Sequence, residues 1–143
     1  MKAGQELCEF NTLYKEMDEI YHEFALKKGI SDSVLMIYYF MVQFGDGGLQ
    51  RDIAAYYCTS KQTIHSSVKK LEEQGFLCAN EGRGRDRKLY FTPAGRRFAE
   101  EKIVPLIEAE NGIFADMVPE ERTEFLRLTR KYVSLFREKT KRL

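Results

Sequence analysis

The sequence has few of the features that would place it outside the class of ordinary globular proteins. Its 143 residues include only 3 prolines and 10 glycines, while 43% are hydrophobic and 31% are charged, a composition that excludes a disordered or collagen-like chain. The longest apolar run, Val34 to Val42, has nine residues, whereas a membrane span needs about 20. We therefore expect one domain with a single core and no membrane span.

Cysteine is also scarce and follows no pattern. The three cysteines, Cys8, Cys58 and Cys78, form no Cys-X-X-Cys pair, which suits a reducing compartment better than a disulfide-linked secreted protein. The first ten residues carry acids in place of the basic and apolar segments of an export signal. We therefore expect a cytoplasmic protein.

Catalytic and metal-binding patterns are missing from the sequence. It has two histidines, His22 and His65, and no Gly-X-Ser-X-Gly, His-Glu-X-X-His or phosphate-binding glycine loop. Cysteine, histidine and carboxylate residues do not cluster as a metal site requires. The sequence therefore predicts no enzymatic activity, no cofactor and no bound metal.

Charge is distributed unevenly along the chain. The net charge is only +1, yet residues 60–97 carry nine Lys or Arg against four Asp or Glu. A basic segment of this kind is the electrostatic footprint that a polyanion would use. The middle of the chain is therefore the candidate nucleic-acid-binding region.

Helical periodicity covers most of the sequence. The expected helices cover residues 7–24, 34–44, 49–57, 61–74, 93–114 and a last segment from Pro119 onward. Gly29 and Gly75 follow two of these segments, as is typical of helix ends. Ser31 is a residue type that caps the start of a helix, and Pro105 predicts a kink.

After Gly75 the pattern changes to that of a β-hairpin. Two short apolar runs, 76–79 and 89–92, flank a polar tip over 80–88. The tip contains glycines, which let a backbone approach a duplex closely, and arginine can enter a narrow minor groove. We therefore expect the tip to bind DNA through its four cations, Arg83, Arg85, Arg87 and Lys88.

The helix over 61–74 has two unlike faces. Ile64, Val68 and Leu71 form a narrow apolar stripe. The opposite side carries amide, hydroxyl, imidazole and ammonium groups, the donors that reach base edges and phosphates. With the preceding helix it has helix-turn-helix spacing, which predicts a recognition helix. The expected DNA contacts here are Ser60, Lys61, Gln62, Thr63, His65, Ser66, Lys69 and Lys70.

Four segments together resemble the MarR family of bacterial transcription regulators. They are residues 49–54, 60–64, 70–77 and 89–95. The resemblance covers nearly the whole chain and implies a mainly α-helical fold with a small β-hairpin wing. It implies a single domain over residues 1–143, with a winged helix-turn-helix lobe at 46–92 and a helical dimerisation lobe formed by 5–45 and 93–140.

The function implied by this resemblance is sequence-specific binding of double-stranded DNA by a homodimer on a pseudo-palindromic operator. Such regulators are usually repressors that a small ligand or oxidation releases from DNA. The family's ligand crevice lies near the first two helices, where tyrosines would suit a phenolic or aromatic effector. The candidate ligand-binding residues are Tyr14, Tyr21, Tyr38 and Tyr39, and packing in the dimer core is the alternative interpretation of them.

Two cysteines and the function class leave alternatives open. Cys8 lies near the start of the first helix, where the hydroperoxide-sensing branch of the family has a reactive cysteine, so it is a candidate redox sensor or a partly buried structural residue. Cys58 stands where the family often has glycine, which predicts either a left-handed backbone that costs about 1 kcal/mol or a slightly different turn. Because fold does not fix function, a winged-helix protein-protein adaptor is the alternative class.

Overall fold

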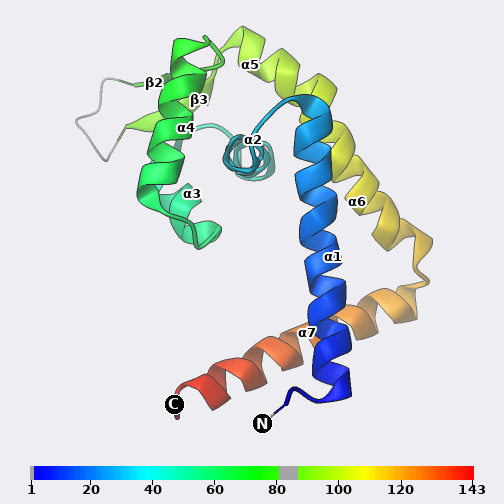
Figure 1. The fold of residues 1–143 in the computed structure, drawn as a ribbon. Coiled ribbons are helices and arrows are strands. Elements are labelled where there is room, and N and C mark those ends of the chain that lie inside the picture. The colour runs from blue at the N-terminus through cyan, green and yellow to red at the C-terminus, as the bar shows by residue number, and fades with distance from the viewer. Residues whose placement is uncertain (1, 81–86) are drawn as a thin grey trace. The chain divides into compact units, whose positions relative to one another are not determined.

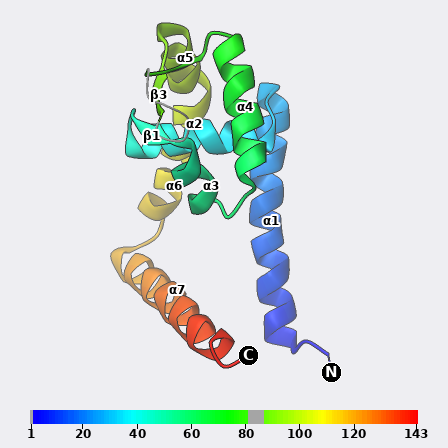
Figure 2. The same ribbon diagram turned by 90° about the vertical axis from the view of Figure 1, so that its left-hand side faces the viewer.

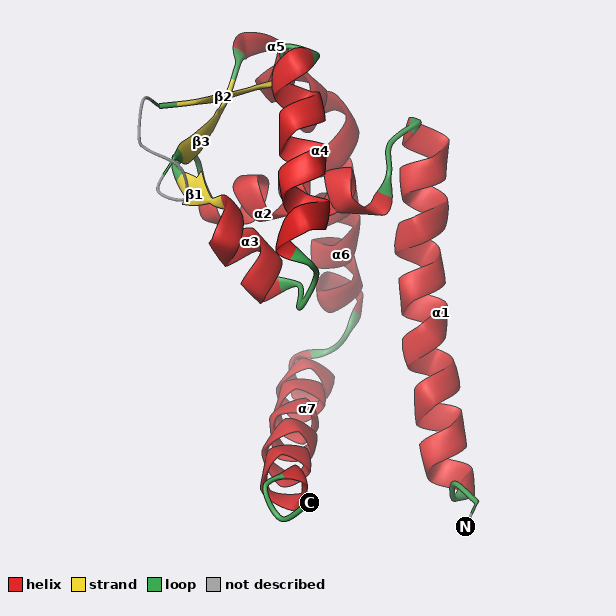
Figure 3. Cartoon of the chain, turned by 60° about the vertical axis from the view of Figure 1, so that its left-hand side comes forward, coloured by secondary structure: helices red, strands yellow, loops and turns green. Residues whose placement is uncertain are grey.

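The computed structural model describes residues 2–80 and 87–143. The chain divides into two compact units, Met1–Val104 and Pro105–Leu143. As predicted, the structure is mainly helical with one small antiparallel sheet (Figure 3). The expected division into a lobe at 46–92 and a lobe formed by 5–45 and 93–140 stays a prediction.

The first unit begins with two helices whose ends are set by local signals. α1 (Gln5–Lys28) ends at Gly29, which adopts a left-handed conformation with φ of +69° that costs glycine little. α2 (Asp32–Phe44) begins at Ser31, whose hydroxyl accepts a hydrogen bond from the Val34 N–H at 3.2 Å. Both signals were predicted from the sequence, and the structure confirms them.

α2 forms the centre of the core of the first unit. Figure 1 shows it nearly end-on between α4 (Lys61–Glu73) and α1, and in Figure 2 α4 crosses in front of it. The buried residues of α2 are Val34, Leu35, Ile37, Tyr38, Phe40 and Met41. α1, which is described over its whole length, buries Ala25 alone. The nearly continuous apolar sequence of α2 therefore corresponds to burial on most sides.

The helix-turn-helix packs beside a three-stranded sheet (Figure 3). Its first helix is α3 (Gln50–Tyr56) and its second is α4. The strands are β1 (Gly48–Leu49), β2 (Leu77–Ala79) and β3 (Lys88–Phe91), in the order β1-β3-β2. The hairpin of β2 and β3 confirms the prediction. β1, in which Gly48 pairs with Leu89, is an addition that the sequence pattern does not show.

A contact that only glycine allows joins the end of α4 to the start of α5 (Pro93–Phe98). A Cβ atom on Gly95 would lie 1.9 Å from the carbonyl oxygen of Phe76. The same carbonyl accepts a hydrogen bond from the Thr92 N–H at 3.1 Å. The Thr92 hydroxyl donates to the Gly75 carbonyl at 2.6 Å and accepts from the Gly95 N–H at 3.0 Å. These bonds hold α4, β3 and α5 together at one point.

The helix that starts with α5 changes its hydrogen-bonding pattern before Pro105. Ala99–Ile103 form a π-helical stretch, and α6 (Val104–Asp116) follows. Proline donates no backbone hydrogen bond, and its ring collides with the carbonyl four residues earlier. A wider turn relieves this conflict. The irregularity expected at Pro105 therefore takes the form of the π-helical stretch before it.

The second unit consists mainly of α6 and α7 (Pro119–Thr140). The rings of Phe114 and Phe125 lie 6.2 Å apart within it. α7 begins at Pro119 as predicted, and although the whole helix is described it has no buried residue. In the described parts of both units, no helix combines the length and the apolar sequence that crossing a membrane requires.

Candidate nucleic-acid interface

The turn between α3 and α4 depends on one left-handed residue and on several hydrogen bonds. Cys58 has φ of +50°. The alternative of a left-handed backbone at this position is therefore confirmed, and this conformation costs about 1 kcal/mol. The Thr59 N–H donates to the Ala54 carbonyl at 3.0 Å. Ser60 caps α4 by accepting from the Thr63 N–H at 3.1 Å. These contacts fix the direction in which α4 leaves the turn.

α4 has a buried apolar face and an exposed polar face. Ile64, Val68 and Leu71 are buried in the core. The eight residues at which DNA contacts are expected on this helix are all exposed: Ser60, Lys61, Gln62, Thr63, His65, Ser66, Lys69 and Lys70. The first acidic residue of the helix is Glu72, so no carboxylate of the helix offsets the positive end of its dipole. This face can therefore present donors to base edges and phosphates.

Gln50, at the start of α3, contacts His65 on the exposed face of α4. Its side-chain oxygen lies 3.1 Å from Nδ1 of His65. Because a carbonyl oxygen only accepts, Nδ1 carries the hydrogen in this contact, and a neutral ring then keeps Nε2 as an acceptor. Gln50 is not among the predicted DNA-binding residues, since the pair spans the turn and no periodicity within one helix reveals it.

An ion pair braces the base of the wing against α4. Nη2 of Arg87 lies 3.1 Å from Oε1 of Glu72. Directly after β2, the Asn80 side chain accepts a hydrogen bond from the Lys88 N–H of β3 at 2.9 Å, and Lys88 is exposed. In the free protein Arg87 therefore has a structural contact, while Lys88 is accessible. The other two predicted wing contacts, Arg83 and Arg85, lie outside the described residues.

Asp46 anchors the sheet to α5. One of its carboxylate oxygens accepts a hydrogen bond from the Phe91 N–H at 3.3 Å, and the other pairs with the Arg96 guanidinium. This guanidinium also lies over the Phe91 ring, 5.8 Å from its centroid. The sequence indicates only that Asp46 follows a helix, because its partners lie far away in the chain.

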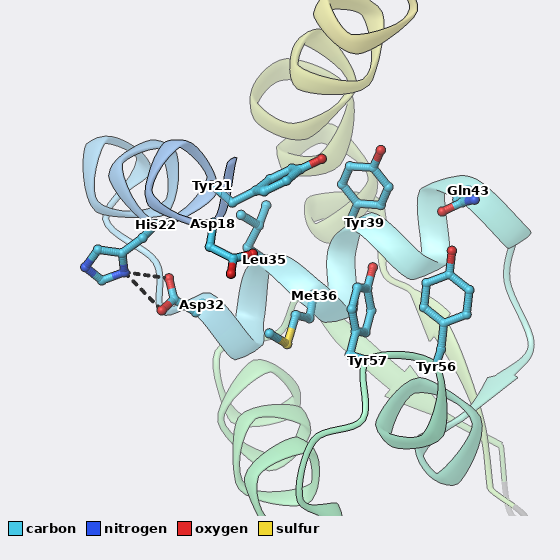
Figure 4. A pocket seen from close by; sticks show the side chains of 10 residues that line it. All are labelled: Asp18, Tyr21, His22, Asp32, Leu35, Met36, Tyr39, Gln43, Tyr56 and Tyr57. Carbon is cyan, nitrogen blue, oxygen red and sulfur yellow. Dashed lines mark hydrogen bonds and ion pairs between the residues drawn. The ribbon is translucent and has the colours of Figure 1, made fainter. Parts of the chain in front are cut away.

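A cavity of about 580 Å³ lies between α1, α2 and the C-terminal end of α3 (Figure 4). Its lining residues are Asp18, Tyr21, His22, Asp32, Leu35, Met36, Tyr39, Gln43, Tyr56 and Tyr57. Tyr21 and Tyr39 are two of the four tyrosines that the sequence predicts as ligand contacts. Tyr56 and Tyr57 are not among the predicted ligand contacts, because the prediction covers tyrosines of the first two helices and these two belong to the helix-turn-helix.

Two contacts between α1 and α2 shape this cavity. Nδ1 of His22 lies 2.9 and 3.0 Å from the two carboxylate oxygens of Asp32. The rings of Tyr21 and Tyr39 lie 6.4 Å apart and nearly perpendicular to each other. The cavity therefore has a hydrogen-bonded histidine and aspartate in one part of its wall and an edge-to-face tyrosine pair in another (Figure 4).

The other two tyrosines predicted to bind a ligand do not line the cavity. Tyr14 is exposed on α1, with its ring 6.2 Å from that of Phe10. Tyr38 is buried, and its ring lies 5.4 Å from that of Phe91 and 5.0 Å from that of Phe98. Burial raises the pKa of the Tyr38 hydroxyl to about 12, and this hydroxyl has no hydrogen-bond partner among the described residues. Tyr38 therefore belongs to the core.

The cysteines are free and exposed. Sγ of Cys8 lies 3.8 Å from the carbonyl oxygen of Ala3, in the first turn of α1. Cys8 is exposed in the single chain, and both interpretations of it, as a redox sensor and as a partly buried structural residue, stay predictions. Across residues 2–80 and 87–143, no three His, Cys, Asp or Glu side chains are grouped as a metal site.

Known proteins match this chain by structure. No protein family model and no curated protein matches the sequence. A MarR family regulator from Neisseria meningitidis is 22% identical, with a TM-score of 0.78 over 96% of both chains. Staphylococcus aureus MarR in complex with salicylate and kanamycin is 15% identical, with a TM-score of 0.70 over 91% of this chain and 89% of that chain. Staphylococcus aureus MepR in complex with DNA is 19% identical, with a TM-score of 0.67 over 94% of this chain and 99% of that chain. The chain therefore has the fold of the MarR family of transcriptional regulators.

Proposed function

We propose that the protein is a transcriptional regulator that binds double-stranded DNA sequence-specifically through α4 and the wing. The observation that carries this proposal is the outer face of α4, where the predicted contacts are exposed and no carboxylate precedes Glu72. An α-helix of this kind fits the major groove, where each base pair presents a distinct pattern of donors and acceptors. The DNA complex of MepR, which shares the fold, supports the proposal.

The DNA-binding form is a homodimer on a pseudo-palindromic operator. Large apolar side chains are exposed in each unit, and surface of this kind is typical of a subunit interface. On α1 they include Leu7, Phe10, Leu13, Met17 and Ile20, between 41% and 61% exposed. On α7 they include Phe125, Leu128, Leu135 and Phe136, between 43% and 60% exposed. A two-fold dimer would place its two recognition helices in successive major grooves.

The regulator is a repressor that a small aromatic ligand releases from DNA. The cavity is lined by α2 and by the end of α3, and α2 contacts α4 directly, because the hydroxyls of Ser33 and Ser67 lie 2.6 Å apart. A ligand that binds one arrangement of these helices more tightly than another therefore changes the affinity for DNA. The salicylate complex of Staphylococcus aureus MarR supports an aromatic effector.

The test is a fluorescence anisotropy titration with the DNA upstream of the protein's own gene and with a scrambled duplex. We expect Gln62→Ala to lose about 1–3 kcal/mol of the discrimination between the two duplexes, because a base contact is removed. Gln74→Ala is the matched control, since it makes the same chemical change beyond the end of α4. Equal affinity of the unmodified protein for both duplexes would overturn the proposal and favour a protein-protein adaptor.

A further inference from the structure

The cavity carries negative charge as well as tyrosine rings. Asp18 and Asp32 are among its ten lining residues, and none of the ten is Lys or Arg. The histidine of the lining, His22, lies against both carboxylate oxygens of Asp32. A ligand that enters the cavity therefore meets carboxylates without a lysine or arginine to bind an anionic group.

The helices around the cavity extend this negative charge. α1 carries six carboxylates against three lysines, and Asp32 is the one charged residue in the sequence of α2. Summed charge of one sign raises the local concentration of ligands of the opposite sign. A carboxylate or phenolate would meet repulsion here, whereas a cation would be attracted.

The tyrosines offer ring faces in several directions. The rings of Tyr21 and Tyr39 are inclined at 82°, and those of Tyr56 and Tyr57 are inclined at 81° with centroids 5.0 Å apart. The face of a tyrosine ring attracts a cation and packs against an aromatic ligand. In Figure 4 the hydroxyls of Tyr39, Tyr56 and Tyr57 point to the same side.

We infer that the cavity binds an organic cation that carries aromatic rings, and not a carboxylate or a phenolate. Asp18 supplies opposite charge, the tyrosines supply ring faces, and Leu35 and Met36 supply apolar surface. A cavity of about 580 Å³ is within the range of sites for drug-sized molecules. The inference rests on the proposed function, because it names the class of effector for the same cavity.

Tetraphenylphosphonium and tetraphenylborate test the inference, because the two ions share one arrangement of rings and differ in the sign of their charge. In isothermal titrations of the free protein, we expect the phosphonium to bind more tightly by at least about tenfold, the effect of roughly 1.4 kcal/mol of charge selection. Asp18→Asn should weaken phosphonium binding by about fivefold, as expected for one partly exposed charge pair. Glu16→Gln, which removes a charge from α1 outside the cavity lining, should weaken binding much less than Asp18→Asn does.

A second pair of variants tests the rings. Tyr21→Leu should weaken phosphonium binding, whereas Tyr21→Phe should retain it, because phenylalanine keeps the ring face. Equal binding of the two ions, tighter binding of the borate, or equal effects of Asp18→Asn and Glu16→Gln would overturn the inference. A protein that binds operator DNA but not the phosphonium contradicts the inference alone. A protein that binds the phosphonium but no DNA contradicts the proposed function alone.

Discussion

Apolar residues recur at helical spacing in both the helix-turn-helix and α1, but the two regions differ in whether these residues are buried. In the helix-turn-helix, Ile53 and Ile64 are 0% exposed. On α1, Leu13, Met17 and Ile20 are 54%, 50% and 61% exposed. The same periodicity therefore describes a completed core in one region and an uncovered surface in the other. The comparison teaches that the helix-turn-helix is packed within one chain, whereas α1 leaves an apolar face that a second surface would cover.

The largest expected effect comes from opening a cavity in the packed region. Leu71 is 2% exposed and Leu26 on α1 is 63% exposed, so one substitution can be compared in both settings. Leu71→Ala should lower the free energy of unfolding by about 2–5 kcal/mol, the cost of a large-to-small change in a core. Leu26→Ala should lower it by less than about 1 kcal/mol. Urea denaturation checks both values, and equal losses would break the comparison.

A charge on the uncovered face of α1 should affect association and not the fold of the chain. Ile20→Glu should weaken dimerisation by roughly 2 kcal/mol, or about thirtyfold, because a carboxylate would be buried in the interface. Thr12→Glu is the control, since Thr12 lies outside the apolar stripe of α1, about 80° around the helix from Ile20. Sedimentation measures association, and circular dichroism checks that the fold is kept. If the unmodified protein were a stable monomer at micromolar concentration, the dimer proposal would be wrong.

The smallest expected effect concerns a polar group inside the packed region. Tyr38→Phe removes a buried hydroxyl that has no partner among the described residues, and should raise the free energy of unfolding by about 1 kcal/mol.

The same variant should change the pH dependence of unfolding. Because the pKa of Tyr38 is raised from 10.0 to about 12 in the folded protein, ionisation of its hydroxyl favours the unfolded chain. The free energy of unfolding is therefore unaffected by this ionisation below pH 10 and falls as the pH rises toward 12. Between pH 8 and pH 11, the free energy of unfolding should therefore fall less for Tyr38→Phe than for the unmodified protein. Tyr14→Phe, at an exposed position, should show the same fall in the free energy of unfolding as the unmodified protein.

The ends of the helices could be predicted because their signals are local. Gly29, Ser31 and Pro93 each act on the backbone of the few residues beside them. β1 could not be predicted in the same way. It has two residues and exists through its pairing with β3, which lies about forty positions later in the sequence.

The same distinction applies to the candidate site. The exposed face of α4 follows from the periodicity of one helix, so its residues could be identified from the sequence. The contacts of Gln50 with His65 and of Arg87 with Glu72 join residues 15 positions apart, across a turn or between elements. The adjacent Tyr38 and Tyr39 differ in role because packing of the helix, and not its sequence, determines which ring enters the core.

Because Arg87 is paired with Glu72 in the free protein, its part in the proposed DNA binding would differ from that of an exposed lysine. A lysine that neutralises a phosphate releases a cation condensed on the DNA, and this release makes affinity fall as salt increases. If Arg87 moved to a phosphate, Glu72 would lose its counter-charge and would take up a cation from solution. Lys69 and Lys88 would therefore contribute to the salt dependence of binding, while Arg87 would exchange one ionic partner for another with no net release of ions.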